Sequence, residues 1–241
     1  MSTLSGSGLS KTYSDTEVVH QLDLEVHPAE VVGLLGPNGA GKTTTFNMLA
    51  GGIRPTSGRV SLGEAEITDL PMYRRARLGI TYLPQEPSIF RKLSVADNVN
   101  AILETVEPDR AVRRERLREL LAELGLADKA GRRGDTLSGG ERRRVEITRA
   151  LVLDPKFMLL DEPFAGIDPI AVMDIQKIIE QLKTRGIGVI ITDHNVRETL
   201  SICDRAYIIK GGNIIKHGSP QEIASDAQVR EIYLGKNFQL A

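Results

Sequence analysis

The chain has 241 residues, of which 41% are hydrophobic and 26% charged, the balance of an ordinary globular protein. A formal net charge of −1 argues against recognition of nucleic acid or of a membrane surface through bulk electrostatics. The single cysteine, Cys203, excludes an intrachain disulfide and fits a reducing compartment. No apolar run approaches the ~18 residues of a membrane-spanning helix, and residues 1–13 lack the pattern of a signal peptide. We therefore expect a cytoplasmic protein that serves any membrane process through other subunits.

The first third of the chain is predicted to be rich in strands. The expected strands are Val18–Val26, Val31–Leu35, Arg59–Leu62, Glu66–Thr68 and Ile80–Leu83. The first of these partly alternates between apolar and polar residues, as a half-buried strand does. By contrast, Val31–Leu35 is a continuous apolar run closed by Gly36, which favours a central strand. Gly63 separates the third and fourth runs and indicates a hairpin.

The middle of the chain, from about Ser94 to Leu153, carries helical signals and few strand signals. Leucines recur at helical spacing within Arg110–Leu124. Basic residues exceed acidic ones across Arg110–Arg149, and aromatic residues are absent there, so nucleic acid is not indicated. A solvated helical face and a docking surface for a partner both fit this charge pattern.

Strands return after Pro155. The expected elements are strands over Phe157–Leu160, Val189–Thr192, Ala206–Lys210 and Asn213–Lys216, a helix over Ala171–Lys183 and a helical tail over Pro220–Ala241. Strands that alternate with helices favour an α/β fold with a mostly parallel sheet covered on both faces. A helical insert interrupts this alternation.

The sequence GPNGAGKT at Gly36–Thr43 matches G-x-x-x-x-G-K-[S/T] and lies between an apolar strand and a helical stretch. Glycines let backbone amides converge on phosphate oxygens, and the helix that follows adds its positive N-terminal end. Lys42 is expected to reach the terminal phosphates, and Thr43 to offer Mg²⁺ a hydroxyl. The expected phosphate-binding residues are Gly36, Pro37, Asn38, Gly39, Ala40, Gly41, Lys42 and Thr43.

Two acids, Asp161 and Glu162, end the apolar strand Phe157–Leu160. Because side chains alternate along a strand, the two carboxylates need not share a role. We assign Asp161 to Mg²⁺, through water, and Glu162 to the orientation or deprotonation of the attacking water. Solvated acids at a strand end are common, so the assignment of these roles depends largely on the presence of the phosphate loop in the same chain.

The segment Leu137–Glu141 reads LSGGE and predicts a second helix start. Ser138 and Glu141 form an S-x-x-E capping box, a purely structural device. Two glycines in a first helical turn are costly, however, which suggests that something approaches the backbone of Gly139 and Gly140 closely. A serine and free amides at a helix start form an anion site. Since one chain has a single phosphate loop, we expect two copies to pair head to tail, each nucleotide held by the loop of one copy and Ser138–Gly140 of the other.

These segments, in order and across nearly the whole chain, resemble the ATP-binding-cassette (ABC) ATPases. The resemblance implies an α/β P-loop NTPase fold with a mostly parallel core sheet, an N-terminal antiparallel β subdomain and an α-helical subdomain. It implies a single domain over 1–241, with a nucleotide-binding core over 1–84 and 155–225, a helical subdomain over 85–154 that contains LSGGE, and a C-terminal tail over 226–241.

The resemblance also implies roles for residues that alone read as structural. Tyr13 lies where the family stacks an aromatic ring on adenine, and the phosphate loop extends to Thr44. Gln85, in LPQE, resembles the glutamine that senses Mg²⁺ and the attacking water. His194, in TDHN, resembles the switch histidine that contacts the γ-phosphate. Asp168 resembles the D-loop aspartate, although the family often has SALD where this chain has AGID.

ATP and Mg²⁺ are therefore the expected cofactors. The implied catalytic residues are Lys42, Glu162 and His194, and the implied metal set is Thr43, Gln85 and Asp161. Two rival readings are weaker: a non-catalytic nucleotide-binding module leaves Glu162 and His194 unexplained, and no Asn-Lys-x-Asp guanine signature of a GTPase occurs.

Within the family the likeness is strongest to ATPases of lipopolysaccharide exporters, through residues 84–94, 139–147 and 160–169, and branched-chain amino-acid importers are the alternative. The resemblance implies a second copy of the chain and two membrane-spanning permease subunits as partners, no nucleic acid, and a peripheral position on the cytoplasmic face of the inner membrane. Phe90 and Arg91 are candidates for a groove that holds a permease helix, although Phe90 alone fits a core position equally well. A soluble ABC protein acting on DNA or ribosomes usually carries a long coiled-coil insertion or two cassettes, and neither fits 241 residues.

Overall fold

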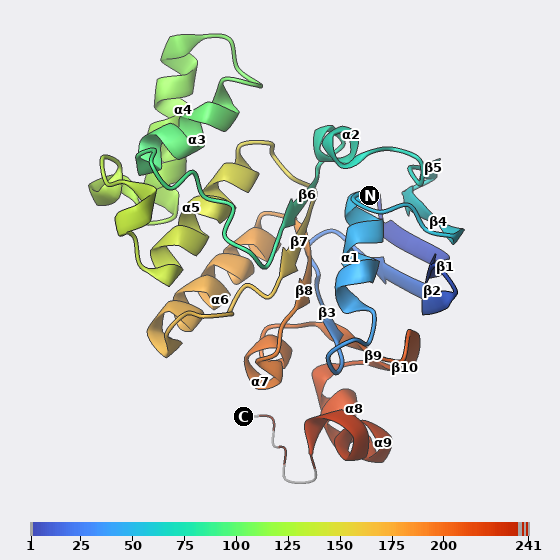
Figure 1. Cartoon of the computed structure of the whole chain (residues 1–241). Coiled ribbons are helices and arrows are strands. Elements are labelled where there is room, and N and C mark those ends of the chain that lie inside the picture. Colours follow the sequence, from blue (N-terminus) through green and yellow to red (C-terminus); the bar gives the residue numbers. More distant parts are fainter. Residues whose placement is uncertain (1, 236–237, 239, 241) are drawn as a thin grey trace.

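The computed structural model describes residues 2–235, 238 and 240. It contains two β-sheets, with the first helix, α1 (Lys42–Ala50), lying between them, and a group of helices to one side (Figure 1). The mixed α/β fold predicted from the sequence is confirmed.

The smaller sheet is antiparallel and has the strand order β2-β1-β4-β5. Its strands are β1 (Leu4–Tyr13), β2 (Thr16–Val26), β4 (Ser57–Leu62) and β5 (Ala65–Glu66). The predicted hairpin around Gly63 is confirmed, although β5 ends at Glu66 rather than Thr68. β1 is not among the strands predicted from the sequence. Its serines and glycines give little alternation, and its register with β2 shifts three times.

The larger sheet has the order β10-β9-β3-β8-β7-β6 and is parallel except for the hairpin of β9 and β10. Its strands are β3 (Val31–Leu35), β6 (Ile80–Leu83), β7 (Phe157–Asp161), β8 (Gly188–Thr192), β9 (Arg205–Lys210) and β10 (Asn213–Gly218). Every residue of β3, β7 and β8 is buried, as their continuous apolar runs predict. Because these strands are parallel, the segments that follow β3, β6, β7 and β8 emerge at one edge of the sheet.

Alternation along the parallel strands places a core on each face of this sheet. On β8, Val189 and Ile191 pack with residues of the helices on one face, while Ile190 packs with Phe46 of α1 and the small sheet on the other. Both layers exclude water from the strands, so the edge where the site lies is rigidly supported.

The remaining helices are α2 (Met72–Arg77), α3 (Val95–Leu103), α4 (Arg110–Glu123), α5 (Gly139–Leu151), α6 (Pro169–Thr184), α7 (Val196–Leu200), α8 (Pro220–Ser225) and α9 (Ala227–Val229), with short 3₁₀ turns at Ala127–Lys129 and Gly134–Thr136 and a π-helical turn at Arg230–Leu234. Helices α3, α4 and α5 stand together on one side of the larger sheet (Figure 1). The predicted tail is helical through Leu234, while its residues 236, 237, 239 and 241 lie outside the described part.

A buried arginine fixes the far end of α1. Arg75 of α2 is 1% exposed, and its guanidinium donates to the carbonyls of Met48 and Leu49 in the last turn of α1, both at 2.7 Å. It also donates to the carbonyls of Thr68 and Leu70. Burial lowers the pKa of Arg75 to about 10, which leaves it charged at neutral pH. A cation at this position satisfies the free carbonyls at the helix end and anchors the helix that begins at the phosphate loop.

Candidate active site

A cavity of about 380 Å³ opens at the carboxyl edge of the larger sheet. Its lining residues are Val18, Asn38, Gly39, Ala40, Gly41, Lys42, Thr43, Thr44, Gln85, Glu162 and His194. The fold therefore brings most of the predicted phosphate loop together with Gln85, Glu162 and His194, from four different segments of the chain. The predicted site residues that do not line this cavity are Tyr13, Gly36, Pro37, Phe90, Arg91, Ser138, Gly139, Gly140, Asp161 and Asp168.

Two glycines are required by the path of the loop. A Cβ on Gly36 would lie 2.0 Å from the carbonyl oxygen of Ile209, and one on Gly41 would lie 2.9 Å from that of Val18. Gly41 is also the N-cap of α1, with φ of 104°, and has no side chain to bond the first amides of the helix. Those amides therefore remain available to an anion in the cavity.

Lys42 lies inside the loop and is 7% exposed. Its ammonium donates to the carbonyls of Gly36 (2.7 Å) and Pro37 (2.9 Å). Burial lowers its pKa, while the nearby carboxylates of Glu162 and Asp161 oppose that shift. The positive charge is thus held at a fixed place within the cavity wall.

Glu162 is the centre of the site and is 8% exposed. Its Oε2 accepts a hydrogen bond from Gln85 Nε2, and its Oε1 lies against His194 Nε2, both at 2.7 Å. Burial raises the pKa of Glu162, while the charge of His194 opposes the shift. The residue has φ of 48°, a conformation that non-glycine residues rarely adopt. Strain of this kind is concentrated at functional sites.

Asp161 is buried at the end of β7. Its Oδ2 accepts a hydrogen bond from the hydroxyl of Tyr82 at 3.0 Å, whereas Oδ1 is buried without a partner. Burial raises the pKa of Asp161 and the bond from Tyr82 lowers it. An unsatisfied carboxylate oxygen at this edge fits the donor set of a hard cation such as Mg²⁺. Within the described residues, no cluster of three or more His, Cys, Asp and Glu side chains could hold a metal on its own.

Three residues that support this site are not predicted from the sequence. Tyr82 bonds Asp161, and Arg143 of α5 donates to the carbonyls of Asp161 and Pro84, both at 2.9 Å. Asp193 accepts amides on both sides of the site. No local pattern marks Tyr82 or Arg143, because their contacts depend on which elements become neighbours. Asp193 has one signal in the sequence, as an acid that lies between the strand Val189–Thr192 and His194.

The predicted second anion site begins α5 and contains the expected capping box. Ser138 Oγ accepts the amide of Glu141 (3.2 Å), and the Glu141 carboxylate accepts the amide of Ser138 (2.8 Å). Side chains of the same chain approach both glycines closely. A Cβ on Gly139 would lie 2.9 Å from Ile167 Cγ2, and one on Gly140 would lie 2.6 Å from the Cβ of Ala171 in α6. Packing against α6 alone therefore accounts for Gly140.

The other predicted residues lie at the surface. Tyr13 is 44% exposed at the end of β1, with the Lys11 ammonium 5.2 Å from its ring centroid. Asp168 is the N-cap of α6 and accepts the amide of Ala171. Phe90 is 42% exposed, with the Arg149 guanidinium 4.3 Å from its ring centroid, so it is not a core residue. Arg91 is exposed beside it.

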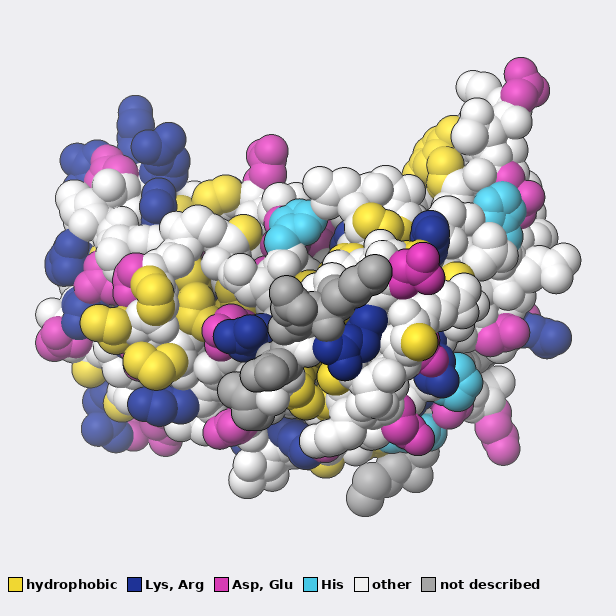
Figure 2. Space-filling view, turned by 90° about the horizontal axis from the view of Figure 1, so that it is seen from below, with side chains coloured by type: hydrophobic (Ala, Val, Ile, Leu, Met, Phe, Trp, Pro, Cys, Tyr) yellow, Lys and Arg dark blue, Asp and Glu magenta, His cyan; other side chains and the backbone are white. Residues whose placement is uncertain are grey.

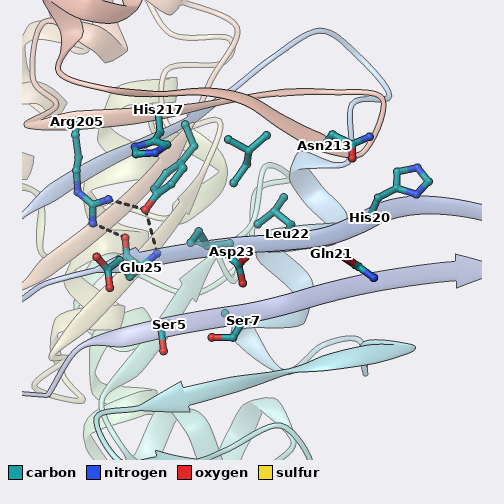
Figure 3. Close-up of a pocket in the computed structure, with 14 residues that line it drawn as sticks. Ser5, Ser7, His20, Gln21, Leu22, Asp23, Glu25, Arg205, Asn213 and His217 are labelled. Atoms are coloured by element: carbon teal, nitrogen blue, oxygen red, sulfur yellow. Dashed lines mark hydrogen bonds between the residues drawn. The ribbon is translucent and has the colours of Figure 1, made fainter.

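A second cavity, of about 530 Å³, lies between β2 and the β9–β10 hairpin and contains none of the predicted site residues (Figure 3). Several of its polar side chains bond to one another or to backbone. Arg205 donates to the Tyr207 hydroxyl and to the carbonyl of Glu25, and Asp23 accepts the amide of Gly8. Nothing in this cavity resembles the arrangement of side chains around Glu162.

The charge pattern of the helical side is mixed rather than uniformly basic. Seen from below, Lys and Arg side chains gather on the left of the molecule, the side of α3–α5, with Asp and Glu among them (Figure 2). Several are paired, such as Arg118 with Glu115 and Arg133 with Asp135. These pairs favour the solvated-face reading of the sequence. Across the described residues, no helix is both long and apolar enough to cross a bilayer.

A glycine-rich loop that connects a buried parallel strand to a helix, with an enclosed lysine and a carboxylate at the end of another parallel strand of the same sheet, defines a P-loop nucleoside triphosphatase. A family model described as "ABC transporter" matches residues 19–165, more than half of the chain. The chain belongs to this family of ATP-binding subunits and is an ATPase that binds ATP.

Similar proteins support the same assignment. The chain is 57% identical to the "Lipopolysaccharide export system ATP-binding protein LptB" of Acidithiobacillus ferridurans, over 98% of each chain. It is 53% identical to the protein of the same name from Escherichia coli K12, over the full length of both. Among solved structures, the ADP conformation of MJ1267, an ATP-binding cassette of an ABC transporter, matches with a TM-score of 0.87 and 28% identity, covering 98% of this chain and 100% of that one.

Proposed function

We propose that this chain is the ATP-hydrolysing motor subunit of an ABC transporter that extracts lipopolysaccharide from the inner membrane for export. The observation that carries the hydrolytic part is the arrangement at Glu162, whose two oxygens are held by Gln85 and His194 on the wall of the phosphate-loop cavity. The export part rests on the names of relatives that are 53–57% identical along the whole chain.

ATP is held through its phosphates by the loop. The free amides after Gly41 and the ammonium of Lys42 face the β- and γ-phosphates, and charge that develops on the transferring group is stabilised where it forms. Tyr13, near the end of the small sheet, stacks on adenine. The bonds from Lys42 to two loop carbonyls keep its ammonium inside the cavity, so the side chain needs to move little when ATP binds.

Glu162 acts on the attacking water. Its buried carboxylate has a raised pKa, which makes it a stronger base than a solvated glutamate. Gln85 fixes one oxygen and leaves the other facing His194, which also contacts the γ-phosphate. His194 thereby joins the base to the group that is being transferred.

Thr43, Gln85 and Asp161 are the residues that hold Mg²⁺, and the free Oδ1 of Asp161 supports this assignment. When bound, Mg²⁺ neutralises charge on the phosphates. Tyr82 orients the Asp161 carboxylate toward this task through its bond to Oδ2.

A second copy of the chain completes the site. Ser138 is not among the residues that line the phosphate-loop cavity, and Gly139 lines an adjoining cavity that shares Gln85 and Glu162 with it. Ser138–Gly140 are assigned to the nucleotide held by the loop of the second copy. Next to Asp168, the side chains of Ile170 (69% exposed) and Met173 (52% exposed) lie open on α6. Exposed apolar side chains beside the D-loop favour a protein interface there.

Two permease subunits receive the motion at the surface that follows Gln85. Phe90 is exposed and stacked under Arg149, so its ring is held outward beside Arg91. In this assignment residues 1–84 and 155–225 form the nucleotide-binding core, 85–154 form the helical subdomain that carries the docking surface, and 226–241 form a tail. The subunit then lies on the cytoplasmic face of the inner membrane.

The hydrolytic proposal is tested with Glu162→Gln. The variant should bind ATP and dimerise but turn over at least about 100-fold more slowly, because it lacks the base. Turnover and ATP-dependent dimerisation are measured on the same preparation. Near-normal turnover contradicts the assigned role of Glu162.

The transport proposal is tested by co-purification from membranes. Two permease subunits joined to a periplasmic lipid-bridging component support lipopolysaccharide export. Recovery of a periplasmic amino-acid-binding protein instead would replace export with amino-acid import and leave the ATPase assignment intact.

A further inference from the structure

Asp193 is a buried carboxylate that the proposed reaction does not use. It lies between the end of β8 and His194 and is 1% exposed. Two backbone amides hold it: Oδ2 accepts the amide of Phe164 at 2.9 Å, and Oδ1 accepts the amide of Asn195 at 2.8 Å. Burial raises its pKa, and the amides of Asn195 and Phe164 oppose that shift. A carboxylate buried at such cost is retained where its acceptor oxygens are needed.

The two bonds join two catalytic segments. Phe164 follows Glu162 by two residues, and Asn195 directly follows His194. A third link lies next to them, since the amide of Glu162 donates to the carbonyl of Thr192 at 2.7 Å. Asp193 therefore fastens the backbone after Glu162 to the backbone around His194, beyond the point where the β7–β8 ladder ends.

The position of the His194 side chain depends on these backbone bonds more than that of a buried side chain would. Its side chain is 52% exposed, so few neighbours restrict the ring, yet its Nε2 lies 2.7 Å from Glu162 Oε1. The backbone that carries the ring must then supply the geometry. A shift of this backbone by about 1 Å is enough to cost a factor of about 100 in rate at a catalytic contact.

We propose that Asp193 is a positioning residue for hydrolysis, which sets the contact between His194 and Glu162 by binding the amides of Phe164 and Asn195. It touches neither nucleotide nor water and acts through His194. The inference rests on the proposed roles of Glu162 and His194.

The first test is Asp193→Asn, which keeps the size of the side chain but replaces one acceptor oxygen with an amide nitrogen that cannot accept a hydrogen bond. We expect kcat to fall by about 10-fold or more, with KM for ATP changed by less than about twofold, because the phosphate loop is untouched. Asp204→Asn is the matched control. Asp204 also accepts a backbone amide, that of Val31 at 2.9 Å, but lies away from the site, so its kcat should be unchanged.

The decisive test is the same substitution in a His194→Ala background, with single-turnover reactions followed for hours. If Asp193 acts through His194, Asp193→Asn lowers the rate by less than about twofold there. A full additional loss in that background indicates a merely structural role and overturns the proposal. A kcat equal to that of the parent protein for Asp193→Asn overturns it as well.

Two further measurements keep the outcomes separable. Asp193→Ser, which also loses the bond to Phe164, replaces Asp193→Asn in both backgrounds if the latter fails to fold. Glu162→Gln is measured alongside. Rapid turnover of Glu162→Gln defeats the proposed function, whereas slow turnover of Glu162→Gln together with a full rate for Asp193→Asn defeats this inference alone.

Discussion

The starts of α1 and α5 differ in how their backbone amides are satisfied, although the sequence marks both glycine-containing helix starts as anion sites. At α1 the N-cap is Gly41, which offers no side chain, so the first amides stay free around Lys42. At α5 the N-cap is Ser138, and the reciprocal bonds with Glu141 already satisfy two amides. The glycines do not show this difference, since a Cβ on Gly140 would meet Ala171 and one on Gly36 would meet the carbonyl of Ile209.

The comparison separates a primary anion site from a secondary one. The loop before α1 can hold phosphate by itself, because its donors have no competing side chains. At the start of α5 the cap bonds between Ser138 and Glu141 already satisfy two amides, so a phosphate can bind only to the donors that remain. We therefore expect substitutions at the first to abolish ATP binding, and substitutions at the second to act on stability and on turnover by the pair.

Lys42→Ala gives the largest expected effect. Loss of the ammonium removes charge-assisted bonds to the terminal phosphates, so Kd for ATP should rise by about 100-fold or more. Binding is measured by calorimetry on the single chain. Lys156→Ala, at an exposed position near the opposite edge of the sheet, is the control and should bind ATP normally. An unchanged Kd for Lys42→Ala would remove the distinction between the two helix starts.

Gly140→Ala comes next and acts on stability. In an open helix this change would gain up to about 1 kcal/mol. Here the new Cβ lies 2.6 Å from the Cβ of Ala171, so α5 and α6 must separate, and we expect a net loss of about 1–3 kcal/mol. Urea unfolding measures it. Gly131→Ala, where no heavy atom lies within 4 Å of the added Cβ, should cost far less. Equal stability of the two variants would show that packing does not explain Gly140.

The sequence predicted more of the first helix start than of the second. Val31–Leu35, GPNGAGKT and the acids after Phe157–Leu160 are contiguous patterns whose meaning is local, and the structure contains the corresponding strands and the cavity. Three contacts join residues 29 to 79 positions apart: the packing of Gly140 on Ala171, the bond from Tyr82 to Asp161 and the bond from Phe164 to Asp193. Such contacts leave no periodicity, and β1 went unassigned for the related reason that its irregular register hides its alternation.

Ser138→Ala gives the smallest expected change in stability, and it should affect turnover without affecting ATP binding by the single chain. The substitution removes one half of the capping box, so the protein should lose about 1 kcal/mol of stability. The chain provides its own control, because Ser219 begins α8 with the same reciprocal bonds to Glu222, at 3.3 and 2.7 Å. Ser219→Ala should cost a similar amount without any effect on hydrolysis.

Only Ser138→Ala should also lower turnover, because only Ser138 is proposed to reach the nucleotide of a second copy. ATP affinity of the single chain should stay unchanged in both variants, and turnover is measured at protein concentrations that favour pairing. If the two serine variants lose the same stability and keep the same turnover, the start of α5 is a cap and nothing more, and the head-to-tail pair loses its main structural argument.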